Sequence, residues 1–169
     1  SSDGARVAFV ERTATWAQDV VVRNLTTGGA ARLTGAVPAS SADTVWRVAF
    51  SRDEQTVLIL VGPTNATDSR PFRMLRGPAS GGALTTIVEP LGRDGQGFAS
   101  VAQEAPDGRL AVMASDSTRV VTRTGAVTSI AGVPYEAPAF DGAGQRLLVD
   151  TTRSSLRVFP ASGTGTGTA

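Results

Sequence analysis

The chain has 169 residues, of which 41% are hydrophobic and 18% charged, and its formal net charge is +1. These values are typical of a folded domain, and they exclude a disordered tail and a strongly basic nucleic-acid-binding surface. Histidine, cysteine and lysine are all absent. Their absence removes the Ser-His-Asp triad, the thiolate nucleophile, the zinc-thiolate site and the lysine Schiff base. The composition therefore predicts a protein that is not an enzyme and that has no cofactor and no metal site.

Short apolar runs predict strands in four successive groups. The expected strands are 6–11, 19–24 and 31–34; then 45–50, 56–61, 71–75 and 84–88; then 98–103, 110–114, 119–123 and 127–130; then 135–140, 145–150 and 155–159. Glycine, proline, aspartate and serine separate them at intervals of about 8 to 12 residues, which is typical of an all-β fold. No segment shows a 3.6-residue apolar period, so we expect no helix.

A tight turn precedes one strand in each group. The turns contain Asp3-Gly4, Asp53-Glu54, Asp107-Gly108 and Gly142-Ala143-Gly144. We expect the three aspartates to accept backbone hydrogen bonds in Asx-type turns, and Gly4 and Gly108 to adopt positive φ. A calcium site is the alternative, but these carboxylates lack the spacing of a calcium-binding loop.

The strands within a group are graded in polarity, which indicates their order in a sheet. In the run 56–61, the side chains of both alternating sets are apolar, which is typical of a strand buried on both faces of its sheet. The last strand of a group, such as 31–34, is polar, which is typical of an exposed edge. Four-stranded antiparallel units of this kind are typical of β-propeller blades. About fourteen strands predict 3.5–4 blades, at about 1–35, 44–89, 97–131 and 134–162, in a domain spanning 1–162. A flexible Gly/Thr tail follows at 163–169.

The first group lacks its innermost strand and the last group lacks its outermost one. We therefore expect a mature or excised piece of a longer protein, which is either part of a larger ring or a nearly closed four-bladed disc. A half-ring exposes two apolar blade faces, so the expected partners are the missing half of the propeller, a second copy in a homodimer, or another protein. No run approaches the roughly 20 apolar residues of a membrane span, so direct membrane insertion is not expected.

The repeats resemble the TolB-like, WD-type propeller repeats of bacterial envelope proteins. The resemblance rests on segments 2–10, 20–25 and 28–34, the last containing Arg32-Leu33-Thr34, and on Pro106-Asp107-Gly108-Arg109. Glu54 and Ala143 depart from the repeat. The resemblance implies a propeller outside the cytoplasm, in the periplasm or at the cell surface as a secreted protein or lipoprotein, whose anchor, where it has one, lies outside this chain.

Candidate binding residues lie in the loops expected at one end of the blades. They are Trp16, Asp43, Asp68, Arg70, Arg93 and Asp94. Trp16 is a candidate anchor for a partner, and the alternative is that it packs over the adjacent blade. Arg70 begins a basic run that could grip a carboxylate or a phosphate, although a solvated strand face also explains it. Arg93-Asp94 is most simply a turn, and Trp46 is expected in the core.

Three functions fit these features. The first is a non-catalytic, protein-binding or scaffolding propeller of the bacterial envelope. The second is the gating propeller of a serine peptidase whose catalytic domain lies outside this chain. The third is a glycan-binding propeller that uses Trp16.

Overall fold

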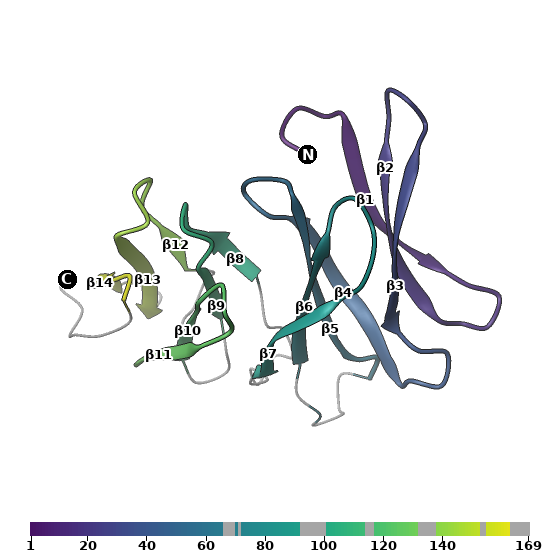
Figure 1. Cartoon of the computed structure of the whole chain (residues 1–169). Coiled ribbons are helices and arrows are strands. Elements are labelled where there is room, and N and C mark those ends of the chain that lie inside the picture. Colours follow the sequence, from purple (N-terminus) through teal and green to yellow (C-terminus); the bar gives the residue numbers. More distant parts are fainter. Residues whose placement is uncertain are drawn as a thin grey trace. The chain divides into compact units, whose positions relative to one another are not determined.

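The computed structural model is all-β (Figure 1). It describes residues 1–65, 70, 72–91, 101–113, 117–131, 138–152 and 155–162, and within these there are fourteen strands and no helix. The predicted all-β fold is therefore confirmed. The chain divides into two compact units, residues 1–89 and 90–169.

The first unit contains two antiparallel sheets. One has the order β1-β2-β3 and the other β4-β5-β6-β7. The strands of the first are β1 (Arg6–Arg12), β2 (Gln18–Asn24) and β3 (Ala30–Val37). Those of the second are β4 (Asp43–Phe50), β5 (Thr56–Pro63), β6 (Phe72–Pro78) and β7 (Thr85–Leu91). Consecutive strands are neighbours, as in a meander of short connections.

The core of this unit lies between its two sheets. Val20, Val22 and Leu33 belong to the same apolar cluster as Val57 and Ile59 of the second sheet. Residues 57–63 of β5 are all buried, so the prediction that this strand is buried on both faces of its sheet is confirmed. The face of β1–β3 turned away from the second sheet is more polar than the sequence predicts. There the Arg23 guanidinium lies 5.8 Å from the centre of the Phe9 ring, and Arg32 pairs with Glu11 and Asp19.

The second unit repeats the arrangement. Its sheets have the orders β8-β9-β10-β11 and β12-β13-β14. The strands are β8 (Val101–Glu104), β9 (Leu110–Met113), β10 (Ser117–Val121), β11 (Val127–Ala131), β12 (Ala139–Phe140), β13 (Arg146–Thr152) and β14 (Ser155–Pro160). Ala111 and Val120 of the first sheet share an apolar cluster with Phe140, Leu147 and Phe159 of the second.

Strand count and polarity therefore define a partial β-propeller. The sheet β1–β3 has no strand on the inner side of β1, and the sheet β12–β14 has no strand on the outer side of β14, among the residues described. Both gaps fall where the sequence predicts them. The expected tail at 163–169 lies outside the described residues.

The expectation that Trp46 belongs to the core is wrong. The register of β4 on β5 shifts between Val45 and Arg47, so Trp46 is the extra residue of a β-bulge. Trp46 is 37% exposed, and its Nε1–H donates to the Pro63 carbonyl at 3.1 Å. Its ring packs edge to face with the Phe72 ring, and the two ring centres are 5.9 Å apart. The bulge turns the indole toward the surface, where its polar nitrogen finds a backbone acceptor.

None of the residues that the structure describes belongs to a helix long and apolar enough to span a bilayer.

Candidate functional site

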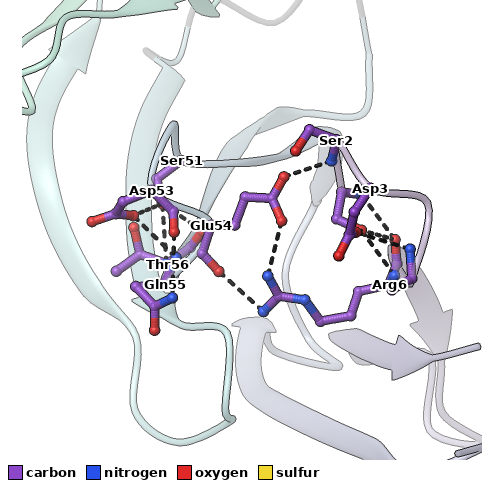
Figure 2. Close-up of polar contacts among 10 residues, drawn as sticks. Ser2, Asp3, Arg6, Ser51, Asp53, Glu54, Gln55 and Thr56 are labelled. Atoms are coloured by element: carbon purple, nitrogen blue, oxygen red, sulfur yellow. Dashed lines mark hydrogen bonds and ion pairs between the residues drawn. The ribbon is translucent and has the colours of Figure 1, made fainter. Parts of the chain in front are cut away.

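The predicted turn aspartates each hold a tight turn that precedes a strand. Asp3 Oδ1 accepts from the Ala5 N–H at 2.9 Å, and Asp53 Oδ1 accepts from the Gln55 N–H at 3.0 Å. A serine hydroxyl, that of Ser1 or Ser51, also donates to each carboxylate at 2.6 Å (Figure 2). The hydrogen bonds from Ser1 and Ala5 lower the pKa of Asp3 below its ordinary value of 3.8. Both carboxylates therefore bind groups of their own turns.

The third and fourth turns are closed in related ways. Asp107 Oδ1 accepts from the Arg109 N–H at 3.1 Å. Burial acts to raise the pKa of Asp107, but the hydrogen bonds and charge of Arg109 outweigh it and lower the pKa. In the fourth turn, where Ala143 replaces the aspartate, Asp141 Oδ1 accepts from the Gln145 N–H at 2.8 Å. A carboxylate two positions earlier therefore takes over the same task.

One position in every turn has a left-handed backbone. Its φ is 70° at Gly4, 55° at Glu54, 82° at Gly108 and 69° at Gly144. Glycine adopts this conformation without steric cost, whereas Glu54 does not. The departure from the repeat at residue 54 therefore replaces the side chain but leaves the backbone path unchanged.

The side chain of Glu54 joins the two sheets of the first unit. Arg6 Nη2 donates to the Glu54 carboxylate at 2.9 Å, and Arg6 Nη1 donates to the Glu54 backbone carbonyl at 3.1 Å (Figure 2). The Ser2 N–H donates to the other carboxylate oxygen. Arg6 also lies over the ring of Phe50, 5.3 Å from its centre. We call this contact the arginine clasp.

The second unit contains an equivalent arginine clasp. Arg109 donates through Nη2 to the Gly144 carbonyl at 2.7 Å and through Nη1 to the Ala161 carbonyl. Its guanidinium lies 5.8 Å from the centre of the Phe140 ring. Gly144 corresponds to Glu54, and Phe140 corresponds to Phe50, since each ring ends the first strand of its sheet. The sequence contains these arginines, but only the packing of two sheets shows what they bind.

The loops at the opposite end of the first unit carry the candidate binding residues. We call this surface the loop end; it consists of residues 13–17, 38–42 and 64–65 with Asp43 and Arg70. The Thr64 N–H donates to the Ala42 carbonyl at 3.0 Å, and Gln18 Nε2 donates to Thr44 Oγ1 at 3.1 Å. These bonds hold the connections of both sheets together.

Trp16 is an exposed aromatic residue on an ordered loop. Its side chain is 71% exposed, and its backbone φ is 67°. The Trp16 N–H donates to the Thr13 carbonyl at 3.0 Å, and the Thr13 N–H donates to the Ala17 carbonyl at 2.8 Å. The Arg12 guanidinium lies 5.9 Å from the centre of the ring. The ring therefore does not pack over the neighbouring sheet, which was the alternative expected from the sequence.

Asp43 and Arg70 are brought together. Arg70 Nη1 lies 2.7 Å from Asp43 Oδ1, and Arg73 Nη2 lies 3.6 Å from Asp43 Oδ2. The Asp43 carboxylate is only 13% exposed. Two arginines of the basic run therefore bind a carboxylate of this chain. The other candidates, Asp68, Arg93 and Asp94, lie outside the described residues.

No cluster of three or more aspartate or glutamate side chains that could hold a metal ion occurs in the part of the chain that the structure describes.

Comparison with known proteins supports the fold. No family model matches the sequence, and no curated protein matches it. Among solved structures, a protein from Agrobacterium tumefaciens assigned as TolB is 13% identical, with a TM-score of 0.52 over 94% of this chain and 59% of that one. A protein from Bacteroides ovatus assigned as dipeptidyl aminopeptidase IV is also 13% identical, with a TM-score of 0.51 over 94% of this chain and 29% of that one.

These similarities identify a propeller-like fold. They do not single out a WD-type propeller. The chain spans about three-fifths of the length of the first of these structures and less than a third of the second.

Proposed function

We propose that this chain is a non-catalytic β-propeller module of the bacterial envelope that binds a protein partner through its loop end. The observation that carries the proposal is Trp16, a large aromatic side chain that is 71% exposed on a loop closed by two backbone hydrogen bonds. Tryptophan is enriched among the residues that dominate protein interfaces, and an ordered loop loses little entropy on binding. The absence of histidine, cysteine and lysine supports the non-catalytic role. The TolB-like repeats support a place outside the cytoplasm, in the periplasm or at the cell surface.

Site-specific photocrosslinking tests this surface. A photoreactive phenylalanine derivative replaces Trp16 in one variant and Leu25 in a matched control, because Leu25 is also exposed, at 59%, but lies at the opposite end of the strands. With envelope extract we expect position 16 to form a discrete adduct with one protein of the extract and position 25 to form no adduct with that protein. Trp16→Ala should weaken binding of the captured protein by about tenfold or more, and Leu25→Ala should leave it unchanged. Equal adducts of both positions with that protein, or no adduct from position 16, would overturn the proposal. Binding to a glycan array that Trp16→Ala abolishes would favour the glycan-binding function instead.

The fold similarity to a protein assigned as dipeptidyl aminopeptidase IV favours a second candidate. In this case the chain is the gating propeller of a serine peptidase, and the nucleophile lies in a domain outside these residues. Treatment of the natural full-length gene product with a fluorophosphonate probe separates the two candidates. A labelled serine outside this chain supports the peptidase, whereas an unlabelled product supports the non-catalytic module.

A further inference from the structure

Three arginines occupy the same position in the turn repeats. The backbone carbonyl of each arginine closes its turn. The Arg6 carbonyl accepts from the amino group of Ser1 at 2.8 Å. The Arg109 carbonyl accepts from the Ala105 N–H at 2.8 Å, and the Arg146 carbonyl accepts from the Asp141 N–H at 3.0 Å. Arg6 and Arg109 form the arginine clasp with the following sheet of their own unit. Arg146 belongs to the last sheet, β12–β14.

The face of β12–β14 turned away from β8–β11 carries a groove. Leu147 and Phe159 point toward β8–β11, so the alternate residues Arg146, Leu148 and Val158 lie on the other face. There they line a groove of about 230 Å³ together with Ala139, Phe140 and Asp141. Leu148 is 37% exposed, and Arg146 is exposed as well. The groove therefore offers an apolar surface and an arginine in the position that forms the clasp elsewhere.

The first sheet, β1–β3, carries the complementary acceptors. Gly4 corresponds to Gly144, since both have the left-handed backbone of the turn. Leu25 corresponds to Ala161, because each binds the residue before one of the three arginines. The Leu25 N–H donates to the Ala5 carbonyl at 2.8 Å, and the Ala161 N–H donates to the Gln145 carbonyl at 2.9 Å.

The surroundings of the two glycines differ. A Cβ built on Gly144 would lie 2.7 Å from Pro106 Cδ of the preceding sheet, whereas a Cβ on Gly4 would meet nothing within 4 Å. The side of the first turn that would receive an arginine is therefore open. On the same face of β1–β3, Val7 is 39% exposed and lies opposite Arg23 of β2. The paired charges of Arg32, Glu11 and Asp19 lie further along this face.

We propose that these two faces form one interface between copies of this chain, arranged head to tail. The sheet β12–β14 of one copy packs against β1–β3 of a second copy. Arg146 donates to the carbonyls of Gly4 and Leu25, as Arg109 donates to those of Gly144 and Ala161. Val7 lies against the groove formed by Leu148 and Val158. Both units already contain this type of interface within the chain, so the second copy continues an existing mode of sheet packing. The inference is independent of the proposed function, whose surface lies at the other end of the strands.

Sedimentation velocity over about 1 to 100 μM tests the contact. We expect reversible association of the wild-type chain. Arg146→Ala should weaken it by about tenfold or more, because the carbonyls of Gly4 and Leu25 lose a charged donor. Arg157→Ala is the matched control, since Arg157 is an exposed arginine of β14 that does not line the groove. Gly4→Glu should strengthen association, because it reproduces the carboxylate that Glu54 offers to Arg6. A chain that stays monomeric at every concentration, or equal effects of the two arginine variants, would overturn the proposal.

Disulfide trapping provides a second, independent measurement. In the first unit, Ser2 of one turn contacts Glu54 of the next turn, and the corresponding positions in the proposed interface are Gly142 and Gly4. The chain has no cysteine of its own, so Gly142→Cys and Gly4→Cys introduce the only thiols. Glu54 shows that this left-handed position accepts a side chain. A mixture of the two single variants should form a heterodimer, in excess of the homodimers of either alone. If the double variant instead forms an internal disulfide as a monomer, the chain closes on itself and the proposal fails.

Discussion

Arg6 binds both the carboxylate and the backbone carbonyl of Glu54, at 2.9 and 3.1 Å, although 48 residues separate them. The contact joins β1 to the turn that precedes β5. It also explains a non-glycine residue with a φ of 55°, because the side chain of Glu54 gains partners that a glycine cannot offer. Local backbone strain is thus combined with a contact between two sheets.

Substitutions at residue 54 separate the backbone strain from the contact. Glu54→Ala removes the carboxylate and keeps a side chain at positive φ, whereas Glu54→Gly removes the carboxylate and the strain together. Because a left-handed alanine is less stable than a left-handed glycine by roughly 1 kcal/mol, we expect the alanine variant to be the less stable of the two. Urea unfolding of both variants and the wild type measures the order. An alanine variant at least as stable as the glycine variant would show that the backbone at this position is not strained.

The contact also predicts a pH dependence of stability. The hydrogen bonds from Ser2 are the largest influence on the Glu54 carboxyl group, and with Arg6 they lower its pKa below the ordinary value of 4.5. A carboxyl whose pKa is lower in the folded state stabilises the fold above its unfolded pKa, and this stabilisation is lost as the pH falls through the folded pKa. The difference in unfolding free energy between wild type and Glu54→Gln should therefore be largest at neutral pH and shrink below about pH 4.5. A difference that stays constant down to pH 3 would contradict this prediction.

A close approach in the second sheet makes Gly62 essential. A Cβ on Gly62 of β5 would lie 2.2 Å from Cδ1 of the Phe72 ring, which belongs to the neighbouring strand β6. Gly62→Ala should therefore cost about 2 kcal/mol or more through overpacking. Combining it with Phe72→Leu should recover part of that loss, because the smaller side chain can move away. Gly29→Ala is the control, with a predicted effect within about 0.5 kcal/mol, since its Cβ would meet only Thr27 Oγ1 at 3.4 Å. Chemical denaturation of Gly62→Ala, Phe72→Leu, their double variant and Gly29→Ala tests the coupling.

The fourth turn provides a matched pair of glycines for the second unit. Gly144 has a φ of 69° and lies against Pro106, whereas Gly142 has open space around it. We expect Gly144→Ala to destabilise the chain by about 2 kcal/mol, because strain and a clash with the preceding sheet combine. Gly142→Ala should change stability by less than about 0.5 kcal/mol. Thermal unfolding followed by circular dichroism compares the two variants. Equal losses would mean that the turn does not pack against Pro106.

The sequence by itself determined the strands and their order. Turn residues mark where each strand begins, and the polarity of a strand reflects whether it lies at the centre or the edge of a sheet. Such signals are local, so the fourteen strands of the described residues, and the two sheets that contain only three of them, could be predicted from the sequence. The hydrogen bonds of Asp3, Asp53 and Asp107 belong to the same class, because each joins residues two positions apart.

Only the tertiary structure decided which residues meet between sheets and which face solvent. Glu54 looks like a loss of the turn glycine until Arg6 is seen to bind it. Trp46 looks like a core residue until a bulge turns it outward, and Trp16 is left exposed by the path of its loop. These outcomes depend on the register and stacking of strands far apart in the chain. No local pattern encodes such a relationship, because the energy of each contact depends on two segments that only folding brings together.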